Sequence, residues 1–177
     1  MKYLDHNPKK VALVCMGPSC TDYMQYVLTQ EFNPYWVDEV WAINMAANAF
    51  RFDVCFWMDD LEQQKQFRPM LMEALRQFNK PVITSKRYPK IVPKSFDFPI
   101  QEVGSLALKE FGMPYLNNGV AMAVAYAIWK KVETLFLYGA DFTYPNRDYA
   151  ESGRACVEMW LGLACARGMK LGLPPGT

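Results

Sequence analysis

The stretch from Tyr115 to Tyr144 reads YLNNGVAMAVAYAIWKKVETLFLYGADFTY, and its pattern decides the fold class. Residues 120–131 carry small or apolar side chains on nearly every face, which predicts a helix buried against a sheet. Residues 134–138 are a continuous apolar run of the kind that forms a central strand covered on both faces. Asp141 follows just past the carboxyl end of that strand, where open α/β sheets bind ligands.

The rest of the chain alternates apolar runs with helical patterns. Strands are predicted at residues 11–15, 39–44, 53–58, 81–85, 99–103 and 169–173, with 99–103 as a short edge strand. Helices are predicted at residues 21–30, 61–78 and 149–167, with a short helical turn at 46–50 and an irregularity at Pro69. Helices that alternate with buried strands indicate an α/β protein with a Rossmann-like, doubly wound, mostly parallel sheet and helices on both faces.

The composition indicates one ordinary globular domain. We expect that domain to span residues 1–177, with a flexible tail at 1–9 and a loop or lid at 86–98. The net charge of +1 gives no strong nucleic-acid signal. No apolar run reaches the roughly 18 residues of a membrane span, and the polar N-terminus is unlike a signal peptide, so we expect a cytoplasmic protein. Five cysteines without CxxC spacing and a single histidine, His6, favour reduced thiols over a zinc site.

Polar residues follow most of the predicted strands. Because the carboxyl ends of parallel strands meet at one edge of a sheet, these residues predict a ligand crevice there. The residues are Gly17, Pro18, Ser19, Asn44, Asp59, Asp60, Thr84, Ser85, Asn117, Asn118 and Asp141.

Each of these positions has a purely structural alternative. The turn at residues 17–19 could hold a phosphate on free helix N–H groups, or it could be a plain strand-to-helix turn. Of Asp59 and Asp60, one could cap the next helix while the other holds Mg²⁺ or ribose hydroxyls. Residues 117–119 could contact a ligand, cap the buried helix, or do both. Asp141 could bind a ligand or anchor the amides of the turn that follows it.

Three further polar residues follow Asp141 on the same side. The hydroxyls of Tyr144 and Tyr149 and the guanidinium of Arg154 could hold a phosphate. Arg154 could instead pair with Glu151 or Glu158 on its own helix.

Two segments together resemble a known group of proteins. VALVCMGPS (residues 11–19) is similar to the GxGPS segment of small bacterial sialyltransferases and of the related 6-hydroxymethylpterin-pyrophosphokinase-like proteins. NNGVAMAVAYAIWKKVETLFLYGADF (residues 117–142) looks like their shared helix followed by a strand that ends in Gly-x-Asp-Phe. VWAINMAANAF and DVCFWMDD fall where these proteins have strands ending in Asn and Asp, and GMKLGLPPGT fits their last strand and turn.

The resemblance implies a Rossmann-like domain that binds a nucleotide or sugar nucleotide at the strand ends, a cytidine sugar nucleotide in the sialyltransferases. In the pyrophosphokinase-like branch, ATP and Mg²⁺ occupy a comparable crevice, and Asp59 would suit the metal. The nucleotide-binding residues that we expect, including two from the tyrosine and arginine argument above, are Gly17, Pro18, Ser19, Asn44, Asn118, Gly119, Tyr144 and Arg154.

Two positions depart from the sialyltransferase pattern. Met16 stands where those enzymes have asparagine, and no histidine follows the Gly-x-Asp-Phe strand, where they have their general base. If a carboxylate accepts the proton instead, the candidate catalytic residues are Asp60, Asp141 and Glu151.

We therefore predict a nucleotide-dependent transferase of glycosyltransferase (sialyltransferase-like) type, with a small-molecule nucleotide as its ligand. One alternative is a Mg²⁺-dependent pyrophosphokinase or other phosphoryl-transfer enzyme. Another is a nucleotide-binding module without catalysis. A site completed by homo-oligomerisation is a further possibility, because the aromatic content suits a buried interface.

Overall fold

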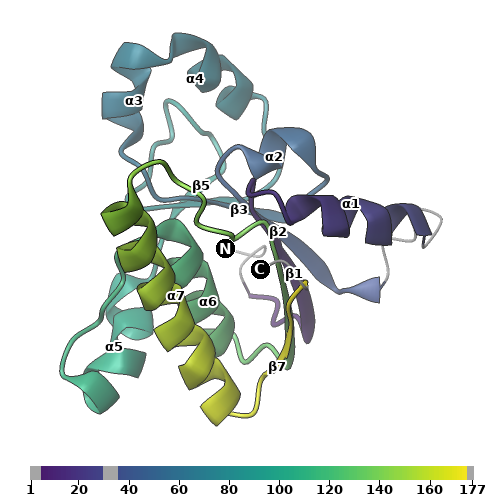
Figure 1. Cartoon of the computed structure of the whole chain (residues 1–177). Helices are drawn as coiled ribbons and strands as arrows, with labels where there is room; N and C mark the ends of the chain where they lie inside the picture. The colour runs from purple at the N-terminus through teal and green to yellow at the C-terminus, as the bar shows by residue number, and fades with distance from the viewer. Residues whose placement is uncertain (1–4, 30–35, 175–177) are drawn as a thin grey trace.

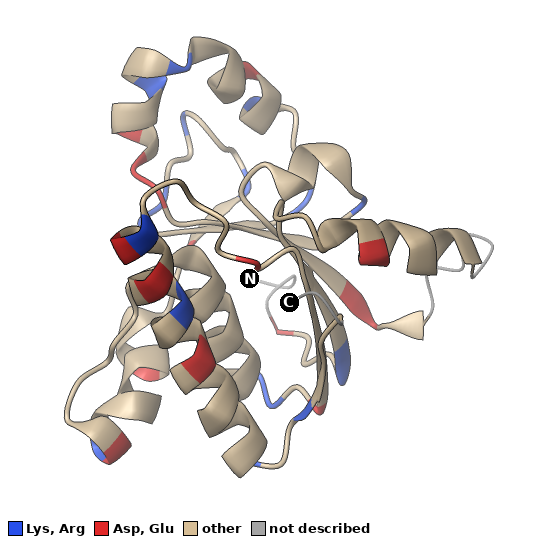
Figure 2. Ribbon diagram, in the orientation of Figure 1, with Lys and Arg blue, Asp and Glu red and all other residues tan. Residues whose placement is uncertain are grey.

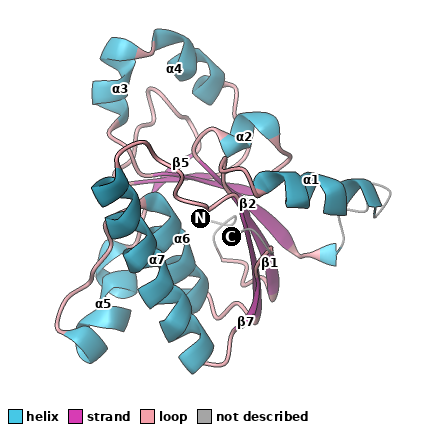
Figure 3. Ribbon diagram, viewed as in Figure 1, coloured by secondary structure: helices cyan, strands magenta, loops and turns pink. Residues whose placement is uncertain are grey.

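A computed structural model of the chain describes residues 5–29 and 36–174, and within these ranges one sheet is flanked by seven helices (Figures 1 and 3). The strands are β1 (Lys10–Val14), β2 (Glu39–Ile43), β3 (Val54–Trp57), β4 (Val82–Thr84), β5 (Ser95–Asp97), β6 (Thr134–Tyr138) and β7 (Lys170–Gly172). The helices are α1 (Cys20–Thr29), α2 (Ala46–Ala49), α3 (Leu61–Phe67), α4 (Pro69–Arg76), α5 (Ile100–Phe111), α6 (Gly119–Trp129) and α7 (Arg147–Ala166). All strands are parallel, in the order β5-β4-β3-β2-β1-β6-β7, which confirms the predicted fold class.

The helices cover both faces of the sheet (Figure 1). Successive residues of β1 point to opposite faces, as the period of a strand requires. Val11 and Leu13 belong to the core beneath α5, α6 and α7, whereas Ala12 and Val14 belong to the core beneath α1. Helices α2, α3 and α4 cover the same face as α1, over β3 and β4. These four of the five β1 residues have no exposed surface, as expected of a central parallel strand.

Helix α6 is buried on almost every side. The four alanines between residues 121 and 127 have no exposed surface, and their small side chains let the helix lie close to the sheet and between α5 and α7. Tyr126 fills the wider space beside them, with its ring 5.5 Å from that of Trp41 and 5.3 Å from that of Phe56. This close packing fixes the position of the helix start, which borders the candidate site described below.

The edge strand predicted at residues 99–103 is wrong, because these residues belong to α5. Pro99 stands just before the helix, where a missing N–H group costs nothing. Gly112 ends the helix with a positive φ of 71°, a conformation that glycine adopts without strain. The buried residues Val103 and Ala107 lie one turn apart on the face that packs onto the core.

Two other predictions along the chain are sharpened by the structure, and a third is tested only in part. The segment 86–98, predicted as a loop or lid, contains β5 and contributes Tyr88, Ile91 and Val92 to the core. The helix predicted over residues 61–78 divides at Arg68 into α3 and α4, and Pro69 opens the second helix. The predicted tail at 1–9 lies in part outside the described residues.

The cysteines and the helices bear on two further expectations. All five cysteines are free thiols, and Cys15, Cys55 and Cys156 are buried. Burial raises the pKa of each of these three thiols, so they stay protonated at neutral pH. Of the helices in the described part of the chain, none is both long and apolar enough to cross a membrane.

The loops after β1 and β6 bind each other where the chain leaves the sheet in opposite directions. The Gly17 N–H donates to the Gly139 carbonyl at 2.8 Å, and the Gly139 N–H donates to Ser19 Oγ at 2.9 Å. The Ser19 N–H donates to Asp141 Oδ2 at 2.8 Å. A Cβ atom at Gly17 would lie 2.3 Å from Asp141 Oδ2 and 2.6 Å from the Gly139 carbonyl oxygen, so only glycine fits there.

We expect Gly17→Ala to lower the free energy of unfolding by about 1–3 kcal/mol. The new methyl group would clash with the Gly139 carbonyl oxygen, and relieving the clash requires a shift of the backbone. Gly162→Ala is the control, since a Cβ atom there meets nothing within 4 Å in the exposed face of α7. This control should raise the free energy of unfolding by up to about 1 kcal/mol. Urea denaturation at a common m-value measures both. Wild-type stability of Gly17→Ala would contradict the tight loop contact.

Candidate functional site

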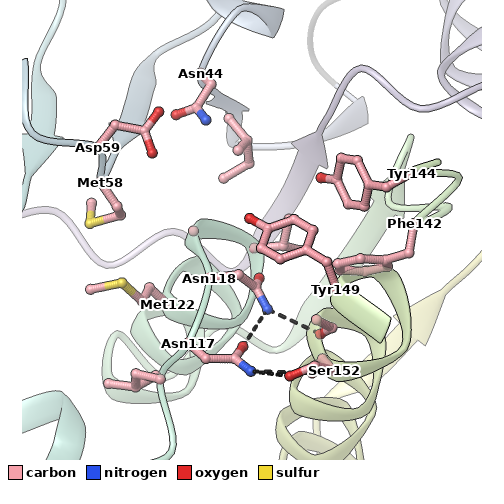
Figure 4. A pocket seen from close by; sticks show the side chains of 15 residues that line it. Asn44, Met58, Asp59, Asn117, Asn118, Met122, Phe142, Tyr144, Tyr149 and Ser152 are labelled. Atoms are coloured by element: carbon pink, nitrogen blue, oxygen red, sulfur yellow. Dashed lines mark hydrogen bonds between the residues drawn. The ribbon is translucent and has the colours of Figure 1, made fainter. Parts of the chain in front are cut away.

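Two adjoining cavities lie at the carboxyl ends of β1, β2, β3 and β6, and Figure 4 shows the larger one. Their volumes are about 430 Å³ and about 320 Å³. Five residues border both: Ile43, Asn44, Val120, Phe142 and Tyr144. The cavities occupy the sheet edge at which the polar strand-end residues were expected to meet.

The first wall of the larger cavity is the start of α6. Asn118 caps this helix, because its Oδ1 accepts from the Ala121 N–H at 2.9 Å. The Asn118 Nδ2 group donates to the Gly153 carbonyl on α7 at 3.0 Å, and the Asn117 Nδ2 group donates to Ser152 Oγ at 3.3 Å. These bonds, dashed in Figure 4, hold the start of α6 against α7.

Two N–H groups at the start of α6 remain available to a ligand. The first N–H groups of any α-helix have no acceptor within the helix. Asn118 satisfies those of Ala121 and Met122, through its side chain and its carbonyl respectively. Within the described residues, the N–H groups of Gly119 and Val120 meet no acceptor, and both residues line the larger cavity. Together with the positive end of the helix dipole, they form a place for an anion.

The second wall carries Asn44 and Asp59, at the ends of β2 and β3. Asn44 has a φ of 50°, a left-handed conformation that asparagine tolerates better than most residues, and its N–H donates to the Phe56 carbonyl at 2.9 Å. Asp59 Oδ2 accepts a hydrogen bond from Gln64 Nε2 at 2.8 Å. Figure 4 shows both side chains across the cavity from Asn118.

The third wall is aromatic. The ring of Tyr144 lies 6.1 Å from that of Phe142 and 5.3 Å from that of Tyr149. Figure 4 shows the hydroxyls of both tyrosines directed into the cavity. Partial burial raises the pKa of Tyr144, and the neighbouring Tyr149, Cys15 and Asp59 add to this increase. The Tyr144 hydroxyl therefore remains a hydrogen-bond donor at neutral pH.

Neither cavity is lined by a described lysine or arginine, and Asp59 is the one charged residue on their walls. Charged residues of both signs lie along α7 instead (Figure 2). Glu151 pairs there with Arg147 at 2.6 Å, and Arg154 pairs with Glu158 at 3.6 Å. Glu151 and Arg154 border a neighbouring cavity of about 190 Å³, which shares Phe142 and Tyr144 with the two main cavities, and neither residue lines those two.

The turn after β1 contributes surface to the site but no free N–H groups from its helix start. Gly17 and Pro18 line the smaller cavity, whereas Ser19 is buried and binds the loop after β6. The Cys20 N–H donates to the Gly17 carbonyl at 2.9 Å, and the Thr21 N–H donates to the Pro18 carbonyl at 3.2 Å. The hydrogen bonds therefore do not support a phosphate at this turn, and they favour the start of α6.

Asp60 and Asp141, two of the candidate bases, lie outside both cavity walls. Asp60 Oδ1 caps α3 by accepting from the N–H groups of Glu62 at 2.9 Å and Gln63 at 3.4 Å. Asp141 Oδ2 holds the Ser19 N–H, and its Oδ1 is buried without a hydrogen-bond partner among the described residues. Asp60 therefore has the helix-cap role that was its structural alternative. Asp141 also anchors a turn, but it is the turn after β1 and not the one that follows Asp141.

A magnesium site built from protein side chains is not supported. Within the described residues, no three His, Cys, Asp or Glu side chains gather closely enough to hold a metal ion. Asp59 is the single carboxylate on the cavity walls, so waters and ligand oxygens would have to supply the remaining positions of an octahedral Mg²⁺.

Several residues of the site were not among the site residues predicted from the sequence. Phe142 has a positive φ of 51°, and its ring packs so closely on α7 that a Cβ atom at Gly153 would lie 2.8 Å away. Ser152 lies inside a helical pattern, and Gln64 is one of several polar residues on α3. Their roles depend on the distance between elements, which no local pattern records.

Comparison with known proteins supports the fold. No protein-family model and no curated protein matches the chain. The solved structure of the sialyltransferase CstII from Campylobacter jejuni in complex with cytidine-5'-monophosphate has a TM-score of 0.55 and 15% identity, over 95% of this chain and 81% of that one. The CstII structure with CMP-3FNeuAc has a TM-score of 0.56 and 16% identity, over 93% of this chain and 79% of that one. The chain therefore has a sialyltransferase-like α/β fold, and a relation to the pyrophosphokinase-like branch is not shown.

The cap at Asp60 has a testable pH dependence. Although desolvation opposes the change, hydrogen bonds from the N–H groups of Glu62 and Gln63, aided by Lys86, hold the pKa of Asp60 below its ordinary value. A carboxylate of this kind stabilises the fold above its unfolded pKa, and the stabilisation is lost as the pH falls through the folded value.

Asp60→Asn keeps a capping side chain but cannot ionise. We therefore expect it to be less stable than the wild type at pH 7 and to approach the wild type below about pH 3. Urea denaturation across this pH range measures the difference. A stability difference that does not change with pH would contradict the assignment of the charged carboxylate as the cap.

Proposed function

We propose that this chain binds a CMP-activated sugar and transfers the glycosyl group to an acceptor hydroxyl. The observation that carries the proposal is the open start of α6 at the junction of the two cavities. Val120 borders both cavities, and its N–H and that of Gly119 offer two donors to one phosphate. The similar CstII structures hold CMP or a CMP-sugar analogue, which supports a ligand of this class.

The surrounding residues suit such a ligand. The hydroxyls of Tyr144 and Tyr149 point into the same space and can donate to phosphate oxygens (Figure 4). Hydrogen bonds to charged groups contribute about 1.5–3 kcal/mol each. From a phosphate at the junction, the nucleoside would extend into the smaller cavity against Gly17 and Pro18. The sugar would then occupy the larger cavity beside Asp59.

The charge of the cavities favours a sugar nucleotide over ATP. The phosphodiester of a CMP-sugar carries one negative charge, whereas ATP carries about four. Burying charge without a counter-charge is costly, and the cavity walls offer no lysine, no arginine and no group of metal ligands among the described residues. We therefore favour glycosyl transfer over the pyrophosphokinase alternative.

A nucleotide-binding module without catalysis is the second candidate. The observation in its favour is the position of the single histidine. His6 Nδ1 lies 2.8 Å from Oε1 of Glu39, the first residue of β2. The histidine is therefore at the opposite edge of the sheet from the cavities. The two candidate functions share one nucleotide site, and turnover separates them.

Ligand-induced stabilisation tests the proposed site directly. We expect CMP and CMP-N-acetylneuraminic acid to raise the melting temperature, by an amount that corresponds to about 2.7 kcal/mol at a hundredfold excess over Kd. ATP with Mg²⁺ should give a smaller shift. The proposal is wrong if no cytidine nucleotide stabilises the protein, or if ATP with Mg²⁺ stabilises it more.

Gly119→Val tests the position of the phosphate. A Cβ atom at this position would lie 3.8 Å from both Ile43 Cγ2 and Met58 Cγ, which is ordinary contact, so we expect the variant to fold. Its two methyl groups would fill the cavity floor beside the free N–H groups. We expect CMP binding to weaken at least tenfold, or about 1.4 kcal/mol, by isothermal titration calorimetry.

Gly162→Val is the matched control, because it places the same side chain in a helix that has open space at that point. It should bind CMP like the wild type. Unchanged CMP affinity in Gly119→Val would place the phosphate elsewhere.

A further inference from the structure

Among the described residues, Asp59 is the one carboxylate that borders the proposed transfer cavity. The other groups that could exchange a proton there are poorly suited to accept one. Cys15 borders the smaller cavity, and burial raises its pKa, so the thiol stays protonated. The pKa of Tyr144 is likewise raised by its partial burial. His6 lies at the other edge of the sheet.

A relay from the core orients Asp59. The indole of Trp57 is buried and can only donate, and its Nε1–H donates to Gln64 Oε1 at 3.0 Å. This bond fixes the orientation of the Gln64 amide, so its Nε2 group faces Asp59 and donates to Oδ2 at 2.8 Å. Asp59 is exposed, yet one of its oxygens is held by a side chain anchored in the core. Within the described residues, Asp59 Oδ1 accepts no hydrogen bond and is available to a substrate.

We propose that Asp59 is the general base of the reaction and that Gln64 is its positioning residue. This inference rests on the proposed glycosyl transfer. The oxygen of the acceptor hydroxyl forms a bond to the anomeric carbon of the sugar. The bond from that carbon to the phosphate oxygen breaks, and its electron pair leaves with CMP. The hydroxyl proton moves to Asp59 Oδ1, which then releases it to water.

The placement of Asp59 suits this role better than a contact to the nucleotide. It borders the larger cavity and not the smaller one, where the nucleoside would lie. It stands across the larger cavity from Asn118, the cap of the helix whose first N–H groups would hold the phosphate (Figure 4). If the configuration inverts, the acceptor hydroxyl attacks the anomeric carbon from the face opposite the leaving group. A base that takes the proton of this hydroxyl must therefore lie on that face, as the carboxylate base does in inverting glycosidases.

Hydrolysis of CMP-N-acetylneuraminic acid provides the test, because water can take the place of an unknown acceptor. Release of CMP gives kcat and KM, and calorimetry gives the Kd for CMP. We expect Asp59→Asn to lower kcat by about 10²–10⁴-fold, the usual contribution of a general base, while the Kd for CMP changes less than threefold. The acid limb of the pH–rate profile should disappear in this variant. Formate should restore part of the rate to Asp59→Ala.

Gln64 and a neighbouring charge refine the test. Gln64→Leu removes the bond that orients Asp59, so we expect kcat to fall about tenfold with KM little changed, since a misplaced group loses rate rather than affinity. Glu62→Gln removes a carboxylate from the same helix, and it should leave both constants at the wild-type values.

The outcomes separate this inference from the proposed function. If the wild type binds CMP and hydrolyses the sugar nucleotide, but Asp59→Asn does so at the same rate, only the base assignment fails. If Asp59→Asn loses CMP binding and rate together, Asp59 is a ligand contact and the base assignment again fails. If the wild type binds no CMP, the proposed function fails and takes this inference with it. Binding without any hydrolysis or transfer by the wild type also overturns the base assignment.

Discussion

The mutual binding of the loops after β1 and β6 is the constraint on which the candidate site depends. Gly17, Ser19 and Asp141 hold these loops together with three short hydrogen bonds around a space too small for any side chain at residue 17. A buried polar oxygen without a partner costs free energy, and Asp141 Oδ1 is such an atom among the described residues. The contact between the loops therefore persists although the unpaired oxygen lowers the stability of the fold. Phe142 and Tyr144 come just after Asp141 in the sequence, and both line the cavities.

Much of the fold could be predicted from local patterns, because buried parallel strands and the all-apolar α6 are continuous in the sequence. The state of residues 99–103 could not, since the sequence Pro-Ile-Gln-Glu-Val fits an edge strand as well as the first turn of a helix. The helix continues to Gly112, and the packing of Val103 and Ala107 onto the core favours the helix over the strand. Such tertiary context has no local signature.

The candidate site was predictable in its location and less so in its roles. Asn44, Asp59, Asn118 and Gly119 line the larger cavity because strand and helix ends meet at one edge of a parallel sheet. The three aspartates at strand ends could not be told apart in advance. Asp60 meets N–H groups of its own helix, Asp141 meets Ser19, and Asp59 meets Gln64. The donor within reach decides what each carboxylate does, and that depends on geometry.

The absence of described lysine and arginine residues from the walls of the two cavities has a consequence for how a ligand arrives. Lysine and arginine residues that surround an active site attract anions over a distance of about one Debye length, and salt weakens that attraction. Here the walls carry no such residues among those described, so a nucleotide would be recognised only on contact, by directed N–H and O–H groups. Association would then be slow relative to steered encounters and nearly independent of ionic strength. Abundant small anions, which lack the groups that fill the two cavities, would compete poorly for the same place.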